Sequence, residues 1–206
     1  NNQIEKKISN LSNGINVELK EVKLVLDLIN FQFNSKTLGP KIKSNNQILE
    51  IESIKTQVSL KSIFKDSFLF KNLDISTKSI EIKKLISFIR SIERDPKLLI
   101  LENFIKKGHI IADIKLKFDK TGNINNNYKI NGFVKNGKID LFKKHKIEKI
   151  NFNFEIRKAI SNFTDIKFVY KDLDLVLEKL TTQSIDDEIN IIGKFNNKNL
   201  IIKKSF

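Results

Sequence analysis

The sequence predicts a mainly β protein: a long, curved and twisted antiparallel β-sheet with two short amphipathic helices at about residues 83–107. Three observations support this fold class. From Gly108 onward, apolar and polar residues alternate almost without interruption. The same alternation occupies much of residues 15–82, and helical spacing replaces it only between Lys83 and Gly108. A period of two residues is typical of β-strands with one apolar and one solvated face.

The composition is that of a folded protein, and it indicates a segment of a longer chain. Hydrophobic residues make up 40% and charged residues 30% of the 206 residues, which is typical of a globular protein rather than a disordered one. There is no methionine, even at position 1, so we expect any membrane anchor or targeting signal to lie outside this segment. The expected parts are an N-terminal β segment (1–82), a helical pair (83–107) and a C-terminal β meander (108–206), together one continuous domain.

Short strands are expected in the N-terminal segment. The first begins at Ile15, and a change of apolar parity near Lys20 predicts a bulge or bend there. The apolar parity changes a second time near Glu52-Ser53. The other expected strands are at residues 28–33, 48–60, 68–75 and 80–82.

The middle of the chain predicts two helices. Apolar residues recur at helical spacing within Lys83–Arg94, at Leu85, Phe88, Ile89 and Ile92. The pair Asp95-Pro96 provides an N-cap and a first-turn proline for the second helix. Its expected apolar stripe is Leu98, Leu101, Phe104 and Ile105. We expect this helix to end at Lys106-Lys107-Gly108, where basic residues and glycine favour a C-terminus.

After Gly108 the sheet is expected to continue as a meander. Thr121-Gly122-Asn123 predicts one turn, and Asn136-Gly137 is a strong type I′ hairpin signal. The expected strands lie at residues 110–118, 124–134, 148–157, 164–170, 173–180 and 188–195, with one more beginning at Leu200-Ile201-Ile202.

The formal charge of +14 favours anionic surfaces, including phospholipid headgroups. Only three of the 38 basic residues are arginines, at Arg90, Arg94 and Arg157. Nucleic-acid readers rely on arginine for bidentate contacts, so we expect no nucleic-acid partner. The basic stretch Lys143–Lys149 has two interpretations: a contact for anionic lipid, or a solvated hairpin edge whose lysines prevent strand pairing.

No catalytic or metal-binding motif stands out. His109 and His145 are the only histidines, and neither has the ligand spacing of a zinc site. The carboxylates at Asp172, Asp174 and residues 186–188 lack the pattern of a calcium loop. The glycines are isolated rather than grouped before a helix, so no phosphate loop is predicted. We therefore expect a non-enzymatic protein without cofactor or metal.

The apolar stripe of the sheet carries the functional expectation. Two short helices offer little surface with which to cover so many strands, although a packed domain buries each apolar face against another layer. The stripe is either an ordinary core or an open groove for acyl chains, and an open apolar face of this size would imply a ligand.

Three stretches resemble the AsmA-like superfamily of bacterial envelope proteins, which includes the TamB and YhdP types. The first runs from Ile54 (IKTQVSLKSIF) to Leu73 (LDISTKSIEI), like the family's strand, turn and strand. The second joins Gly108–Phe118 to DKTGN and to YKINGFV from Tyr128, similar to the family's hairpins. The third runs from Asn151 (NFNF) through Leu173 (LDL) to Ile191 (IIGKF). Together they span most of the chain.

The resemblance implies a repeating β-groove that moves phospholipid between the inner and outer membranes and maintains outer-membrane integrity. It also implies a periplasmic location, with an inner-membrane anchor outside this segment. The expected partners are phospholipid acyl chains, with envelope proteins as further candidates. The alternative is a structural or assembly scaffold of the envelope that binds client proteins by β-augmentation. The candidate lipid-binding residues are Ile114, Leu116, Phe118, Phe152, Phe154, Ile156, Phe168, Tyr170, Leu175 and Leu177.

Overall fold

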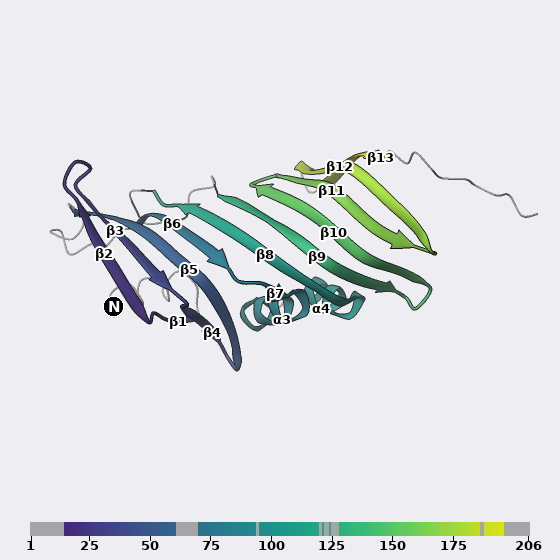
Figure 1. Cartoon of the computed structure of the whole chain (residues 1–206), viewed down its shortest axis with the longest axis horizontal. Coiled ribbons are helices and arrows are strands. Elements are labelled where there is room, and N and C mark those ends of the chain that lie inside the picture. The colour runs from purple at the N-terminus through teal and green to yellow at the C-terminus, as the bar shows by residue number, and fades with distance from the viewer. Residues whose placement is uncertain are drawn as a thin grey trace, which may run out of the picture.

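A computed structural model describes residues 15–60, 70–93, 95–119, 121, 124, 128–185 and 188–195. These residues form one open, twisted antiparallel sheet of 13 strands and two short α-helices (Figure 1). The predicted fold class is therefore confirmed. Among the described residues, no helix has both the length and the apolar character needed to cross a membrane.

The N-terminal strands are arranged around one long strand, β5. The first half of β5 pairs with β4 and its second half with β3, along the same edge. Two antiparallel strand pairs, β1–β4 and β2–β3, therefore lie along the same side of β5. The strands are β1 (Ile15–Glu18), β2 (Glu21–Asp27), β3 (Gln32–Leu38), β4 (Lys41–Ser44), β5 (Gln47–Ser59), β6 (Phe70–Thr77) and β7 (Ile80–Glu81).

One prediction for this part of the chain is wrong. Residues 28–31 form the turn between β2 and β3 rather than a strand. The predicted bulge or bend near Lys20 is confirmed as a bend, which forms a corner between β1 and β2, two strands that pair with different partners. The parity change near Glu52 coincides with a bulge, because the pairing of β5 with β6 shifts between Ile51 and Ser53.

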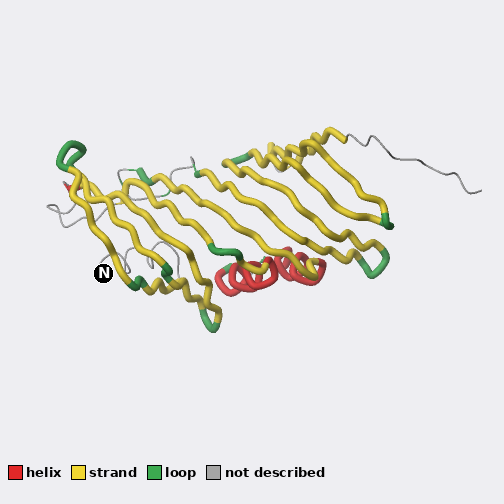
Figure 2. The backbone as a smooth tube through the Cα atoms, in the orientation of Figure 1, coloured by secondary structure: helices red, strands yellow, loops and turns green. Residues whose placement is uncertain are grey.

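The helices α3 (Ile82–Ile92) and α4 (Pro96–Phe104) lie next to each other beneath the strand ends in the middle of the sheet (Figure 2, red). We call this side of the sheet the helical edge. The predicted N-cap is confirmed, since the Asp95 side chain accepts a hydrogen bond of 2.8 Å from the Lys97 amide. The predicted end of the second helix is wrong. Ile105 leaves the helix with extended backbone and begins β8, so Lys106 and Lys107 belong to a strand.

The C-terminal strands form a regular meander in which each strand pairs with the next. They are β8 (Ile105–Lys117), β9 (Lys129–Leu141), β10 (His145–Arg157), β11 (Ile160–Tyr170), β12 (Leu173–Ile185) and β13 (Glu188–Phe195). Four of them have 13 residues, which corresponds to about 43 Å of strand. This part of the sheet therefore offers a long and fairly even surface.

A line of β-bulges crosses the meander and corrects one prediction. Asn136, Lys149 and Asp165 have positive φ values of 53°, 51° and 53°, and the pairing register shifts beside each of them. The pair Asn136-Gly137 therefore lies inside β9, and the turn to β10 comes at residues 142–144. Asparagine before glycine favours positive φ in a bulge as well as in a type I′ turn. The sequence signal therefore indicated the backbone conformation of Asn136 correctly, but the structure uses this conformation in a bulge and not in a hairpin turn.

The core consists of two clusters of unequal size. The larger lies on the N-terminal strands and on α3, and contains Val17, Leu19, Leu49, Ile51, Ile54, Val58, Phe70, Leu73, Ile80 and Phe88. The smaller is on the meander and contains only Ala112, Val134 and Phe154. Predictions for Phe68, for the Thr121–Asn123 turn, for Asp186 and Asp187 and for the strand at residues 200–202 concern residues that are wholly or partly outside the described part of the chain.

Candidate functional site

The strand pairing places the apolar residues of successive strands in rows on one side of the sheet. One row runs from Ile54 through Ile75 and Ile114 to Ile130 and Ile156, each paired with the next. We call the side that carries this row the apolar face. The row passes through the polar residues Ser161 and Thr182 before it reaches Ile191 in β13, so the same side of the sheet continues across the meander, although this row is not apolar throughout.

A second row explains how Phe154 becomes buried. Ala112 pairs with Gly132, and Gly132 pairs with Phe154. The Phe154 ring therefore lies beside a residue that has no side chain. A Cβ atom added at Gly132 would lie 2.6 Å from Cζ of Phe154 and 2.2 Å from the carbonyl oxygen of Ile111. The aromatic ring thus occupies the space left by the missing side chain. Beyond it the row continues to Phe163 and Leu180.

The bulges keep the apolar face continuous toward the C-terminus. After the bulge at Asp165, Ile166 pairs with Leu177 and Phe168 with Leu175. Without the extra residue, the side chains beyond it would point to the opposite side, because a shift of one residue reverses the face of every side chain that follows. The parity changes in the sequence are therefore compensated by the bulges.

Two asparagine side chains contact all three of these bulges. The Asn151 side chain accepts a hydrogen bond of 3.0 Å from the Asn136 amide and donates one of 2.6 Å to the Lys149 carbonyl. The Asn153 amide group donates a hydrogen bond of 2.9 Å to the Asp165 carboxylate. Neither asparagine was predicted from the sequence, although their alternation with Phe152 and Phe154 places them on the polar side of β10.

All ten candidate residues lie on the apolar face, but they differ in their surroundings. Leu116 and Phe118 pack against the larger core cluster. Phe152 and Ile156 pack around Phe154, which is buried with 7% of its surface exposed. The other nine candidates are half-buried: Ile114, Leu116, Phe118, Phe152, Ile156, Phe168, Tyr170, Leu175 and Leu177. The face therefore changes from a packed core near β5 to a more open surface on the meander.

Exposure increases further toward the C-terminal edge. Leu173 in β12 is 49% exposed, and Ile189 and Ile191 in β13 are 70% and 65% exposed. The main contacts of α3 are with α4 and with β4, β5, β7 and β8, and those of α4 are with α3, β8 and β9. The helices thus lie over one end of the face and leave strands β10–β13 without a major helical contact.

Two apolar neighbours of the candidates were not predicted from the sequence. Ile130 and Phe163 pack against the small cluster, and Phe163 contacts Phe152 with ring centroids 5.7 Å apart at 76°. Ile130 belongs to the expected strand at residues 124–134, whereas Phe163 lies just outside the expected strand at 164–170 and has polar residues two positions away on both sides.

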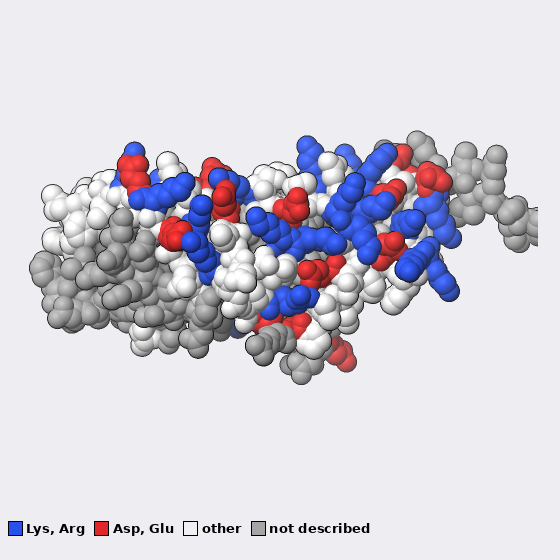
Figure 3. All heavy atoms as spheres, turned by 90° about the horizontal axis from the view of Figure 1, so that it is seen from below, with Lys and Arg blue, Asp and Glu red and all other residues white. Residues whose placement is uncertain are grey.

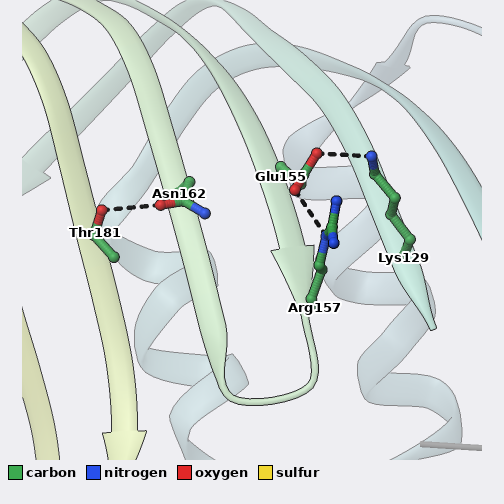
Figure 4. Close-up of polar contacts among 5 residues, drawn as sticks. All are labelled: Lys129, Glu155, Arg157, Asn162 and Thr181. Carbon is green, nitrogen blue, oxygen red and sulfur yellow. Dashed lines mark hydrogen bonds and ion pairs between the residues drawn. The ribbon is translucent and has the colours of Figure 1, made fainter. Parts of the chain in front are cut away.

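The opposite face of the meander is polar (Figure 4). Glu155 pairs with Lys129 and with Arg157, each at 2.8 Å, and Thr181 donates a hydrogen bond of 2.9 Å to the Asn162 side chain. The hydrogen bond from Lys129 is the main cause that lowers the pKa of Glu155 from its ordinary value, and Arg157 adds to the effect. The two faces of the sheet therefore differ sharply in polarity.

A polar group closes one end of the apolar face. Tyr170 contacts His145, with 2.6 Å between the phenolic oxygen and Nδ1 of the imidazole, and the two rings are stacked. The Lys171 ammonium lies 5.5 Å from the centre of the Tyr170 ring. Of the two histidines, His145 thus contacts the end of the apolar face, whereas His109 is exposed on β8.

The described residues contain no group of three or more histidine or acidic side chains arranged to hold a metal ion. Asp172 lies in the tight turn between β11 and β12 with φ of 62°, and Asp174 is exposed at the start of β12. What the described residues do offer is a surface for apolar contact along the sheet.

The chain matches no family model, no curated protein and no solved structure. Its class is accordingly defined by its fold: a mainly β protein with one open antiparallel sheet, apolar on one side and polar on the other.

Proposed function

We propose that the chain is a non-enzymatic, AsmA-like segment whose apolar face holds phospholipid acyl chains and supports lipid transfer across a bacterial envelope. The observation that carries the proposal is the continuous apolar face of β8–β13, on which Phe168, Leu175 and Leu177 are half-buried beyond the two core clusters. Large exposed apolar surfaces commonly mark binding sites for ligands or partners.

The dimensions of the face suit an acyl chain. The long strands measure about 43 Å, and each leaflet of a bilayer contributes about 15 Å to a hydrocarbon core of about 30 Å. Each methylene group removed from water contributes about 0.8 kcal/mol. A chain lying on this surface gains affinity from many weak contacts and needs no specific polar pocket.

The same contacts allow movement along the sheet. Aliphatic and aromatic side chains form consecutive rows from β8 to β12, so a chain leaving one row meets a chemically similar one. The polar opposite face, with Glu155 and its two basic partners, stays in water. In this proposal the protein lies in the periplasm, and an anchor outside the segment attaches it to the inner membrane.

Native mass spectrometry of the protein purified from cells tests this proposal. We expect bound phospholipid on the wild-type chain and its loss from Phe152→Asp Phe168→Asp, which puts carboxylates on the apolar face. Val176→Asp is the matched control, because Val176 is 38% exposed on the opposite face of β12. A folded wild-type chain without lipid, or equal loss from the control, would refute the proposal.

A second candidate function is a scaffold that binds a client strand by β-augmentation. Among the described strands β2 pairs only with β3, and Leu24, Val25 and Leu26 are 59%, 62% and 47% exposed. An apolar edge strand is a template for a further strand. If a second copy adds there, sedimentation will show a dimer that Leu24→Lys Leu26→Lys abolishes without affecting bound lipid.

A further inference from the structure

Two elements at the helical edge of the sheet carry exposed apolar side chains, and those of α4 lie on several sides of the helix. Leu99, Ile100 and Leu101 of α4 are 49%, 53% and 44% exposed, and no residue of α4 is buried. Phe142, in the turn between β9 and β10, is 77% exposed. Its ring contacts that of Phe104 at the end of α4, with centroids 5.1 Å apart and planes at 71°.

The backbone of the turn holds Phe142 outward. Phe142 and Lys143 have positive φ values of 54° and 59°, a conformation that residues other than glycine seldom adopt. The Lys144 amide donates a hydrogen bond of 3.1 Å to the Leu141 carbonyl and closes the turn. A closed turn of this kind presents its two central side chains to solvent rather than folding them onto the sheet.

Exposed lysines lie on and next to the elements that carry these apolar side chains. Six of them are exposed on α4, at the start of β8 and around the turn: Lys97, Lys106, Lys107, Lys143, Lys144 and Lys146. Two nearby carboxylates are already paired, Glu102 with Arg90 at 2.6 Å and Glu148 with Lys138. Figure 3 views the molecule from the helical edge and shows basic side chains crowded toward the C-terminal strands, with fewer acidic ones between them.

A hollow beside the start of β8 extends the basic surface. It has a volume of about 490 Å³, and its basic lining consists of Lys83, Lys106, Lys107 and His109, with Glu81 as the one acidic side chain. The hollow is large enough for a phosphate group, and its excess of cations suits one.

We propose that this basic-apolar edge, formed by α4, the β9–β10 turn and the start of β8, binds the surface of an anionic phospholipid membrane. The aliphatic side chains of α4 and the Phe142 ring enter the interfacial region, and the lysines contact headgroup phosphates. Surfaces that combine apolar side chains with several lysines bind anionic bilayers in this way. The inference does not rest on the acyl-chain proposal, because a protein that carries no lipid could dock on a membrane through this edge.

A nucleic acid fits the edge less well than a membrane does. Leu99, Ile100 and Leu101 would remain in water on a phosphate backbone, whereas a bilayer interface removes them from it. Nucleic-acid grooves also use arginine and stacked aromatic rings, and this edge has lysines and a single exposed phenylalanine. Duplex DNA is nevertheless included in the test.

Tryptophan fluorescence provides a direct test, because the chain has no natural tryptophan. Ile100→Trp places a single reporter on α4. Ile192→Trp is the matched control, since Ile192 is 70% exposed on β13, away from the edge. With phosphatidylglycerol vesicles we expect a blue shift for Ile100→Trp that high salt reduces, and little shift for Ile192→Trp. Neither reporter should respond to phosphatidylcholine vesicles.

Charge reversal tests the role of the lysines. Lys143→Glu Lys144→Glu should weaken binding to phosphatidylglycerol vesicles by at least about tenfold, given the usual contribution of each lysine near an anionic surface. Lys55→Glu Lys71→Glu changes the net charge equally on exposed positions of β5 and β6, and should bind almost like the wild type.

Three results would overturn the inference: no blue shift for Ile100→Trp, equal weakening by both charge-reversed variants, or tighter binding of the edge to duplex DNA than to vesicles. If the Lys143→Glu Lys144→Glu variant fails to fold, the two tryptophan reporters still decide, because neither alters a charge.

Discussion

Gly132 shows how a single residue shapes the apolar face. Its missing side chain leaves the space that the Phe154 ring occupies. Its other neighbour, Ala112, also has a small side chain. Phe154 thereby becomes the most buried of the ten candidate residues. The sequence shows a glycine within an alternating stretch, and this pattern predicts close packing at Gly132, but only the pairing register identifies Phe154 as the partner.

We predict that Gly132→Ala destabilises the protein by about 1–3 kcal/mol, the usual cost of overpacking. The new methyl group would clash with backbone as well as with the Phe154 ring. Gly193→Ala is the control: its nearest neighbour would be Leu180 Cδ1 at 3.0 Å, the end of a flexible side chain, so its cost should be clearly smaller. Urea unfolding measures both, and equal effects would contradict the proposed role of Gly132.

The ion pairs of Glu155 predict a dependence of stability on pH. Its pKa in the folded state lies below the ordinary value of 4.5, chiefly because Lys129 donates a hydrogen bond to it. A group with a lowered pKa stabilises the folded state above its unfolded pKa and loses that contribution as the pH falls through the folded pKa. Glu155→Gln should therefore be less stable than the wild type at pH 7, and the difference should shrink below about pH 4.

Urea titrations at several pH values check this prediction. Introducing Glu155→Gln into a Lys129→Met Arg157→Met background is the control, because the partners that lower the pKa are absent there. A difference between wild type and Glu155→Gln that stays constant from pH 7 to pH 3 would show that these ion pairs contribute nothing.

At the scale of single elements, α4 depends on its termini more than on packing. Asp95 caps its first turn through the Lys97 amide, whereas no α4 side chain is buried. We predict that Asp95→Ala costs about 1 kcal/mol and that Asp95→Asn, which preserves the acceptor, costs much less. Hydrogen exchange of the α4 amides measures this locally, and identical protection in the two variants would contradict the capping role.

Elements also show where prediction from sequence succeeds and where it fails. Alternation and the Asp95-Pro96 cap predict most of the strands and the start of α4 correctly, because they reflect local conformational preferences. The hairpin predicted at Asn136-Gly137 fails, because a bulge needs the same positive φ and only the partner strand distinguishes the two. The end of α4 fails for a related reason, since Ile105 is buried in the sheet and its pairing with Ile139 replaces the last helical turn.

At the scale of the whole molecule, one end of the sheet is packed and the other is open. The sequence predicts that apolar residues share a face, but it does not predict which strands the helices cover, because this depends on topology. The large cluster near β5 and the small one around Phe154 mark the transition. Phe168 and Leu175 lie outside both clusters, so the proposed function expects these two candidates above all to contact acyl chains.

This asymmetry predicts a gradient of local stability. Amide protons of β5, β6 and β8 should exchange most slowly and those of β13 fastest, because the first three adjoin the large cluster and Ile189, Ile191 and Ile192 are at least 65% exposed. Addition of lipid should slow exchange mainly in β11 and β12. Uniform protection across the sheet would show that the C-terminal strands are not an open end.

The most direct test of the central claim is the affinity of the protein for single-chain phosphatidylcholines of increasing length, measured below their micelle concentrations. The neutral headgroup avoids the basic-apolar edge. If acyl chains lie half-buried on the apolar face, affinity should rise about twofold with each added methylene, since a fully buried methylene contributes about 0.8 kcal/mol. Phe152→Asp Phe168→Asp should flatten this dependence. Affinity independent of chain length, or equally steep in that variant, would contradict the proposed function.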